Sequence, residues 1–539
     1  MRLQQLSDEL AALLGAGNVI SDPDQLAAAA QTNYPSSQQI PLIIRPATAA
    51  ELAGCLKIAR RYDQAVYVVS RGKNWGYGSK APVQDNCILI ELDRMDRMLD
   101  YDDQLGYITV EPGVTFQQAF DFLRERKSSL LLGTTGGPVD SSLIGNALER
   151  GVGTGVYADR FSAVCGMEVV LPDGSIIRTG FERFPGCATG KLSRWGMGPS
   201  LDGLFSQSNL GIVTRMTIWL VQCPAFFQIG FYKTDSIGKL TQLVDRLQAM
   251  AMEGLIKPAV TLYNDLRVVS AFTQFPFHET EPGALDPDEL MAQIRAKSPV
   301  GAMVGDWNGE ISIRAVSEEH ALLQSRLIEE RIKDLVYDLS FVSATRDEIM
   351  TRLDTHYARG GKTDEPPTLS GFLLNKYIGI PANGAIGYAY WRKRGPVPEV
   401  MDPDRDGCGM LWFSPVVPFR GADVAQAVRI IKSVVKDYRF EAAISFQCLS
   451  ERSIHIIASI SWDREAAGED EQAVSCYREV NRQLKAAGYY AYREATLDMP
   501  LAQAEDDYTR LLQHIKDTLD PGHMLSPGKY IPSPQVSLS

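Results

Sequence analysis

The amino-acid sequence predicts an α+β fold with two domains and a short C-terminal return to the first of them. Its 539 residues exceed one ordinary domain, and a hydrophobic content of 45% is typical of a globular protein with sizeable cores. Short β-branched or aromatic runs alternate with helical patterns over roughly the first 220 residues, and longer helices follow from about Phe226. We therefore expect a first domain at 1–225, a second at 226–487 and the return at 488–539.

The first domain shows short elements bounded by turns. Three segments have the spacing of amphipathic helices: 1–15, 48–62 and 115–127. Runs rich in β-branched and aromatic residues predict strands at 65–70, 87–92 and 106–113. The segment "MEVVLPDGSIIRTG" predicts a hairpin that turns at Pro172-Asp173-Gly174.

The second domain alternates longer helices with strands. Helical spacing covers "IGKLTQLVDRLQAM" and "HALLQSRLIEERIKDLVYDL", residues 320–339, while "GEISIRAV" and "SIHIIASISW" predict strands. The Pro- and Gly-rich stretch 394–409 predicts a long loop in the middle of this domain, with Cys408 in it. Helices follow after Asp470, and the chain then reaches "DPGHMLSPGKY".

Composition and charge exclude several classes of partner. A net charge of −12 argues against nucleic acid and against anionic membranes. Asp8 and Glu9 interrupt the segment where an export signal would need an apolar core, so we expect a cytoplasmic protein. Eight scattered cysteines without a CxxC pair do not predict a disulfide framework, and the six histidines lack zinc-ligand spacing. We expect no metal site.

The loop "SRGKNWGYGSKAP", residues 70–82, follows a strand-like run and contains Gly72, Gly76 and Gly78. Glycines there allow backbone N–H groups to approach an anion, as in phosphate-binding loops. A tight surface turn needs one or two glycines, but it does not need Trp75 and Tyr77. The loop by itself leaves a phosphate site and a surface turn open.

Eight blocks occur in one order between about residues 40 and 530: "GKNWGYGSKAPV", "VEPGVTF", "IGNALERGVG", "CGMEVVLPDGSIIRTG", "WGMGPSLDGLFSQSNLGIVTRMTIWL", "MLWFSPV", "YAYREA" and "DPGHMLSPGK". Together they resemble the vanillyl-alcohol oxidase / para-cresol methylhydroxylase family of flavoproteins. The resemblance implies the two-domain FAD-binding fold of the vanillyl-alcohol oxidase type, with an inserted α/β cap domain. The N-terminal part and the C-terminal tail would form the FAD-binding domain.

The resemblance implies FAD as the cofactor. Backbone N–H groups of the loop after the strand would wrap the pyrophosphate, and the glycines of "GNALERGVG" would let main chain lie close to a flat ligand. Taken alone, these segments would be ordinary turns. The implied FAD-binding residues are Arg71, Gly72, Lys73, Asn74, Trp75, Gly76, Gly78, Ser79, Gly145, Asn146, Glu149, Gly151, Gly153, Ser208, Gly211, Ile212 and Lys529.

The resemblance also implies a substrate site. The family uses two tyrosines and an arginine to hold a para-substituted phenol as phenolate, and the matching positions here are Tyr77, Tyr492 and Arg493. Holding a phenol of pKa near ~10 as an anion at neutral pH costs about 4 kcal/mol, which a guanidinium and two hydroxyl donors offset. The phenolate pushes electrons toward the para carbon, so a benzylic hydride leaves to flavin N5. The quinone methide then takes up water or gives an alkene.

The sequence departs from the family where relatives attach FAD covalently. The His-type position is Met410, and the Tyr-type position is Ala389. We predict non-covalent FAD, although Tyr388 and Tyr390 flank the second position and leave a tyrosyl link open. Cys408 is a further candidate nucleophile for a covalent link to FAD, but the simpler interpretation is that its thiol is free.

Two further departures concern the substrate. The segment before "GN" has a glycine where some oxidases place an acid, and Asp140 lies three residues away. Asp140 serves either as a base for water attack or as a turn residue in "GPVDSS", the second being favoured. The 394–409 insertion is expected near the cavity roof, where it would reshape the site.

Two alternatives to phenol oxidation stay open: FAD-dependent oxidation of a non-phenolic alcohol or 2-hydroxy acid, and a flavin-binding protein without turnover. The electron acceptor is expected to be dioxygen or a small redox protein. A homodimer is a possible assembly, because family members often form dimers or larger assemblies.

Overall fold

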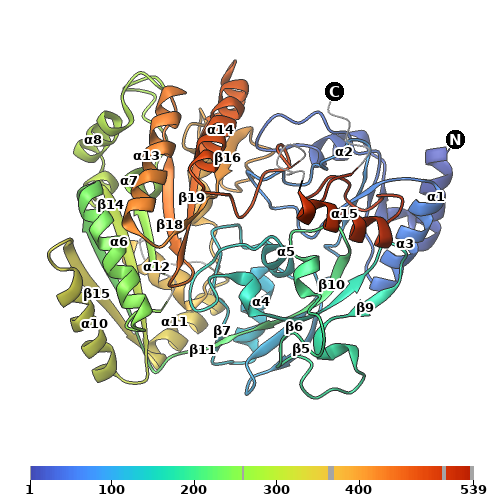
Figure 1. The fold of residues 1–539 in the computed structure, drawn as a ribbon, viewed down its shortest axis with the longest axis horizontal. Helices are drawn as coiled ribbons and strands as arrows, with labels where there is room; N and C mark the ends of the chain where they lie inside the picture. Colours follow the sequence, from blue (N-terminus) through green and yellow to red (C-terminus); the bar gives the residue numbers. More distant parts are fainter. Residues whose placement is uncertain (1, 258–259, 362–368, 500–505, 534–539) are drawn as a thin grey trace.

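The computed structural model describes residues 2–257, 260–361, 369–499 and 506–533. Two bodies of secondary structure stand side by side, one made mainly of the first 222 residues and the other built around a large sheet (Figure 1). Among the helices described, none is long and apolar enough to cross a membrane.

The first body contains two main sheets. The four-stranded sheet has the order β1-β2-β4-β3, from strands Val19–Ile20, Ile43–Ile44, Ile88–Glu91 and Val66–Val69. The five-stranded sheet has the order β5-β6-β10-β8-β9, from strands Met98–Asp102, Tyr107–Val110, Ile212–Trp219, Val164–Val170 and Ile176–Arg178. A short pair joins β7 (Leu130–Leu131) and β11 (Val221–Gln222). The helices around them are α1 (Arg2–Leu14), α2 (Pro23–Ala29), α3 (Ala49–Arg61), α4 (Phe116–Glu125) and α5 (Leu143–Leu148).

Local sequence explains these elements. Helix α4 begins with a capping box, in which Thr115 and Gln118 satisfy each other's backbone N–H groups. Its apolar face is buried, as the helical spacing predicted. Strands β8 and β9 pair antiparallel, and Gly174 in the turn has a φ of +85° that favours glycine. The predicted hairpin is therefore confirmed.

The second body is an eight-stranded sheet with the order β15-β12-β14-β13-β18-β19-β16, and β17 pairs with β19. The strands are β12 (Phe226–Thr234), β13 (Val260–Asn264), β14 (Trp307–Ala315), β15 (Tyr337–Thr345), β16 (Cys408–Phe413), β17 (Val416–Pro418), β18 (Ala443–Cys448) and β19 (Ser453–Asp463). Its longer helices are α6 (Ile237–Met252), α10 (Glu318–Ile332), α13 (Gly421–Asp437) and α14 (Glu469–Ala486). Shorter or flanking helices are α7 (Asp265–Val269), α8 (Pro287–Lys297), α9 (Pro299–Ala302), α11 (Arg346–Ala358) and α12 (Leu369–Ile378).

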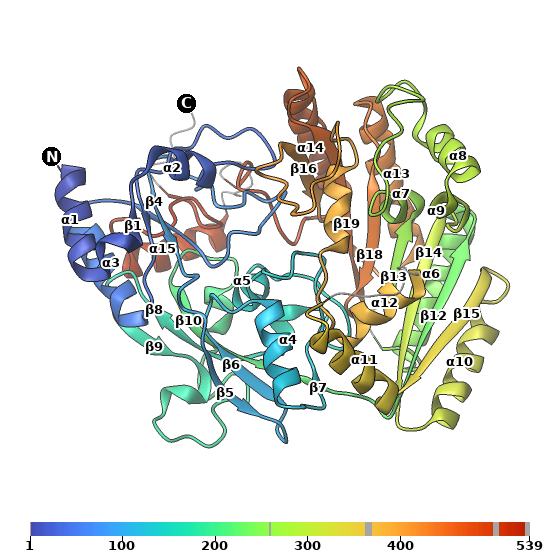
Figure 2. The same cartoon turned by 180° about the vertical axis from the view of Figure 1, so that it is seen from behind.

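The two faces of this sheet differ in polarity because successive side chains of a strand alternate between them. Leu262, Leu411 and Phe446 join the core beneath α6, α10, α13 and α14. Their neighbours Tyr263, Trp412 and Gln447 point the other way and line a cavity. Viewed from behind, α11 and α12 lie beside this second face (Figure 2). The sheet thus supplies one wall of the cavity from alternate positions of its strands.

The chain returns to the first body at its C-terminal end through α15 (Asp507–Leu519). Leu512 and Ile515 of this helix pack against the core of the first body. The backbone N–H of Val66 donates to the carbonyl of Met524 at 2.9 Å, and that of Ser526 donates to the carbonyl of Val66 at 2.7 Å. The C-terminal segment therefore lies directly beside β3.

Two local predictions were wrong. Residues 320–339 were expected to be one helix, but α10 ends at Ile332 and Tyr337 begins β15. This strand pairs antiparallel with β12 at the edge of the sheet, so tertiary pairing overrides local helical spacing. Cys408 was placed in the long loop, but it is the buried first residue of β16, opposite Asp463. The loop itself, 394–407, contains no helix or strand.

Candidate active site

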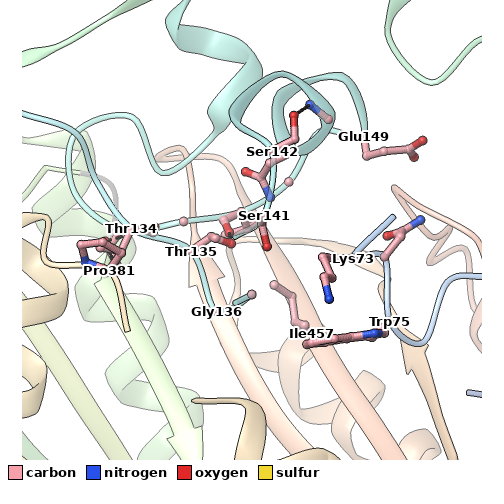
Figure 3. A pocket seen from close by; sticks show the side chains of 18 of the residues that line it. Lys73, Trp75, Thr134, Thr135, Gly136, Ser141, Ser142, Glu149, Pro381 and Ile457 are labelled. Carbon is pink, nitrogen blue, oxygen red and sulfur yellow. Dashed lines mark hydrogen bonds between the residues drawn. The ribbon is translucent and has the colours of Figure 1, made fainter. Parts of the chain in front are cut away.

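A cavity of about 1410 Å³ lies between the sheet wall and the first body. Lys73 and Trp75 from the loop after β3 face the same pocket as Ile457 of β19 and Pro381 (Figure 3). Most residues predicted to bind FAD line it: Arg71, Gly72, Lys73, Asn74, Trp75, Ser79, Gly145, Asn146, Glu149, Gly151, Gly153, Ser208, Gly211, Ile212 and Lys529. The structure does not bring Gly76 and Gly78 to its wall.

The loop after β3 uses its glycines in two ways. All three are in the left-handed region: Gly72 with φ +66°, Gly76 with φ +76° and Gly78 with φ +122°. A Cβ on Gly76 would lie 2.5 Å from the Trp412 ring, and one on Gly78 would collide with Thr496. Gly76 and Gly78 therefore allow β16 and the C-terminal segment to pack closely. Residues 70–75, together with Tyr77 and Ser79, are the part of the loop that lines the cavity.

Glu149, just after α5, is the centre of a buried ion cluster. Its carboxylate lies 2.9 Å from Lys529 Nζ and 3.7 Å from Arg493 Nε, and the Tyr530 hydroxyl donates to it at 2.7 Å. Burial opposes ionisation of Glu149, but Lys529 and Arg493 outweigh burial and lower its pKa to about 2. Lys529, which is predicted to bind the cofactor, and Arg493, which is predicted to bind the substrate, thus both contact the Glu149 carboxylate.

Two buried amide oxygens on the cavity wall, Asn146 Oδ1 and Asn209 Oδ1, have no donor among the described residues. An unpaired buried oxygen costs free energy, so the site requires a ligand or water that donates to them. A Cβ on Gly145 would collide with Ser70, so this wall is close-packed main chain. Flavin N3–H and ribityl hydroxyls supply such donors. The residues present therefore fit FAD.

Tyr77, Tyr492 and Arg493 come together on one wall of the cavity. The Arg493 guanidinium carbon lies 4.1 Å from the centroid of the Tyr77 ring, and Arg493 donates to Asn74 Oδ1. The Tyr77 hydroxyl is 2.6 Å from Ser414 Oγ and also bonds to Tyr492. Burial raises the pKa of both tyrosines, so both remain hydroxyl donors at neutral pH.

His455 of β19 touches this group and was not predicted. Its ring stacks on Tyr492 with centroids 4.5 Å apart. Burial lowers the pKa of His455 to about 4, so the ring is neutral near pH 7. Its Nδ1 has no hydrogen-bond partner in the described part of the chain. In the sequence it is one position of an alternating strand, and no motif marks it.

The cap wall contributes cations that the sequence also did not single out, among them Lys376 and Arg267. Lys376 Nζ lies 3.2 Å from Glu310 Oε2 and 2.6 Å from the Tyr263 hydroxyl. The Arg267 guanidinium carbon lies 4.0 Å from the centroid of the Tyr388 ring. All of these side chains belong to residues that line the cavity. This wall is therefore polar and charged.

The residues considered for covalent attachment of FAD differ in their access to the cavity. Tyr388 lines the cavity. The Tyr390 hydroxyl instead donates to Asp406 Oδ2 at 2.5 Å, and the ring is buried. Cys408 is buried, which raises its pKa and disfavours a reactive thiolate. Met410 and Ala389 are packed in the same apolar cluster.

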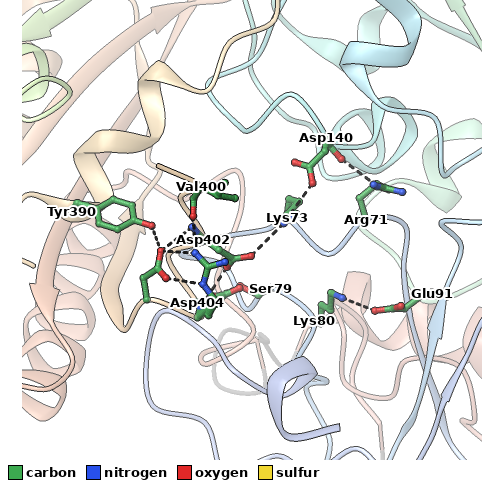
Figure 4. A network of polar contacts seen from close by, with 12 residues as sticks. Arg71, Lys73, Ser79, Lys80, Glu91, Asp140, Tyr390, Val400, Asp402 and Asp404 are labelled. Carbon is green, nitrogen blue, oxygen red and sulfur yellow. Dashed lines mark hydrogen bonds and ion pairs between the residues drawn. The ribbon is translucent and has the colours of Figure 1, made fainter. Parts of the chain in front are cut away.

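The loop 394–407 lies against the loop after β3 (Figure 4). Lys73 Nζ lies 3.4 Å from Asp402 and 3.5 Å from Asp140, and Ser79 donates to Asp404 Oδ1 at 2.9 Å. Burial raises the pKa of Asp404 to about 7. The side chain of Asp140 is 42% exposed beside Lys73, and Asp140 is not among the lining residues. The loop 394–407 covers the turn that is predicted to bind FAD, and Asp140 lies beside this turn.

Comparisons with known proteins agree with this geometry. Residues 40–180 match the model of an FAD binding domain. The chain is 39% identical over 536 residues to 1'-carboxy-chondrochloren decarboxylase of Chondromyces crocatus, covering 98% of each protein. It is 29% identical to the 4-cresol dehydrogenase [hydroxylating] flavoprotein subunit of Pseudomonas putida, over 96% of this chain and 93% of that protein. The structure of substrate-bound p-cresol methylhydroxylase superposes with a TM-score of 0.86 at 27% identity, covering 98% and 97%.

The chain belongs to the vanillyl-alcohol oxidase / para-cresol methylhydroxylase family of FAD-dependent oxidoreductases. A 4-ethylphenol oxidase from Gulosibacter chungangensis shares the fold, with a TM-score of 0.85 at 22% identity over 99% of this chain and 98% of that one. The predicted family, fold class and cofactor are therefore confirmed. Residues that the family resemblance implies for FAD and residues that it implies for substrate line the same cavity.

Proposed function

We propose that this protein removes a benzylic hydride from a para-substituted phenol that is held as its phenolate. The observation that carries the proposal is the group of Tyr77, Tyr492 and Arg493 on the cavity wall. Both tyrosine hydroxyls stay protonated, so they donate to an oxyanion while the guanidinium supplies the opposite charge.

The charges around this group favour an anion. Arg493 and Lys529 carry two positive charges, and Glu149 is the one carboxylate that contacts them among the described residues. One positive charge is left over in a buried site, where a phenolate would balance it. The phenolate directs electrons to the para carbon, so the bond to the benzylic hydrogen weakens there.

Bound FAD supplies the hydride acceptor, flavin N5. Residues 71–75, Asn146, Asn209 and Lys529 would hold the cofactor, and we expect the attachment to be non-covalent. Asp140 lies beside residues 71–75 and fits a turn residue better than a base for water attack. Electrons then pass to dioxygen or to a small redox protein.

An anaerobic spectral titration tests the proposal. The holoenzyme is mixed with para-alkylphenols and para-hydroxybenzyl alcohols, and the flavin band is followed. We expect rapid bleaching by phenols and none by their O-methyl ethers, which cannot form a phenolate. Bleaching by 2-hydroxy acids alone would contradict it. Air admitted afterwards separates an oxidase from a dehydrogenase.

A second candidate is oxidation coupled to loss of CO2. Arg267 on the cap wall and the relatedness to a decarboxylase favour it. In a phenol with a carboxylate on the carbon next to the benzylic one, hydride removal leaves a quinone methide. The bond to the carboxylate then breaks, and its electron pair forms the alkene while the ring regains the phenolate. Vinylphenol, CO2 and the reduced cofactor account for all atoms and electrons, so detecting 4-vinylphenol from 3-(4-hydroxyphenyl)propanoate tests this route.

A further inference from the structure

We propose that Arg267 is the residue that binds a carboxylate on the para side chain of the substrate and so determines specificity. The inference rests on the proposed function, because it assumes that the phenol oxygen lies at Tyr77 and Tyr492. It adds a second anion site at a residue outside all of the family blocks quoted above.

Arg267 has no counterion among the residues that the structure describes. No carboxylate among the described residues forms an ion pair with it, and its Nε is buried without a hydrogen-bond partner. The nearest acid in the sequence, Asp265, is paired instead with Arg295. By comparison, the buried Arg392 lies 2.7 Å from Glu441. Arg267 is half-buried, and its unpaired Nε is buried, so an anionic ligand that accepts from the guanidinium would lower the free energy of this wall.

The two lysines of the cap wall are neutralised: Lys376 lies 3.2 Å from Glu310, and Lys233 lies 2.8 Å from Asp338. The other two cations that line the cavity on this side, Arg267 and Arg352, form no ion pair with a described carboxylate, and Arg352 instead donates to the Asn375 amide. Arg267 therefore carries part of the excess charge of this wall, as Arg493 and Lys529 together do on the other. A substrate with a phenolate and a carboxylate would satisfy both.

The position of Arg267 suits the far end of such a substrate. Its guanidinium carbon lies 5.9 Å from the Trp412 ring, and that ring is stacked on Tyr77 with centroids 6.3 Å apart. Trp412 is thus a common neighbour of the predicted phenolate group and of Arg267. The Tyr388 ring and hydroxyl hold the guanidinium from the side. Arg267 is in this way fixed toward the cavity.

Binding of two matched ligands tests the proposal. Dissociation constants of 3-(4-hydroxyphenyl)propanoate and 4-propylphenol are measured by difference spectra of the flavin, in wild type, Arg267→Gln and Arg267→Lys. We expect Arg267→Gln to weaken the propanoate roughly 10- to 100-fold, with a much smaller effect on propylphenol, because one charge-assisted contact is lost. Arg267→Lys should recover part of the affinity.

Arg352→Gln is the matched control, since Arg352 lines the same cavity but contacts Asn375 rather than Tyr388. It should leave the preference for the propanoate unchanged. Equal weakening of both ligands by Arg267→Gln, loss of bound FAD from that variant, or a loss of preference in Arg352→Gln would overturn the inference. If propanoate binding depends on Arg267 but the propanoate does not bleach the flavin, the result would support the inference about Arg267 and contradict the proposed oxidation.

Discussion

At the scale of single residues, the site combines groups that are far apart in sequence around a few charges. Tyr77 and Arg493 are separated by more than four hundred residues of chain, and they are in contact in the fold. Ser414 and Asn74 hold them from either side. Their orientation is therefore set by the surroundings and not by the side chains alone.

Removal of a single donor from this group should slow reduction of the flavin. Tyr77→Phe or Tyr492→Phe deletes a hydroxyl that would stabilise the phenolate, and a loss of about 10²- to 10³-fold is expected, as for removal of one oxyanion donor. Stopped-flow reduction by 4-ethylphenol under anaerobic conditions measures it. Tyr263→Phe, on the cap wall, is the control and should retain the wild-type rate; an equal loss there would contradict the assignment.

Glu149 should make the protein sensitive to acid. Its pKa in the fold is about 2, below the ordinary value of 4.5. The stability that it contributes is therefore present above pH ~4.5 and is lost as the pH falls toward 2, by about 3 kcal/mol. Unfolding titrations between these pH values should show a steeper loss in wild type than in Glu149→Gln. That variant should itself be less stable at pH 7, because it leaves Lys529 and Arg493 without their carboxylate.

At the scale of elements, the turn after β3 is the part most sensitive to substitution. Gly76 has a positive φ, and any Cβ there meets Trp412 of β16. Gly76→Ala should cost about 1–3 kcal/mol through strain and overpacking, and it should reduce the FAD content of the purified protein. Gly186→Ala is the control, because Gly186 also has a positive φ but no atom lies within 4 Å of the added Cβ. Its loss of stability measures backbone strain alone, and the additional loss in Gly76→Ala measures the collision.

The loop 394–407 should respond to pH through Asp404. The pKa of Asp404 in the fold is about 7, above its ordinary value of 3.8, because the carboxyl is buried. A raised pKa gives stability that is full below pH ~3.8 and is lost as the pH rises through 7. The protection of this loop against hydrogen exchange, relative to the intrinsic rate at each pH, should therefore fall between about pH 4 and 7 in wild type. Asp404→Asn, which keeps the acceptor for Ser79, should show a flatter profile; identical profiles would argue against the idea.

How much the sequence predicted differs from element to element. Periodicity identified α4, the β8–β9 hairpin and two strands of the large sheet, β14 and β19, because each has a local pattern. It extended the helix at 320–339 into β15, since pairing with β12 is a long-range effect that spacing does not reveal. The family blocks identified Tyr77 and Arg493, whereas Arg267 and His455 occupy ordinary helix and strand positions. Only the fold shows that Arg267 lines the cavity and that His455 stacks on Tyr492.

At the scale of the whole molecule, we expect FAD to be retained by contacts with the residues around the cavity and not by a covalent bond. Acid precipitation of the protein should release the flavin into the supernatant. Tyr388→Phe should not change the amount that is released, because we expect no tyrosyl link. Flavin that stays with the precipitate in wild type and is released in Tyr388→Phe would show a covalent link and contradict the prediction.

The pairing of Val66 with residues 524–526 has a consequence for biosynthesis. Strand β3 is translated early, and the segment beside it, together with Lys529, is made more than four hundred residues later. Domains generally fold in order of synthesis, but this one must wait for a late segment to complete its sheet edge and its ion cluster. A nascent chain that has not yet reached residue 529 lacks these contacts, so we expect FAD to bind only after this late segment has been made.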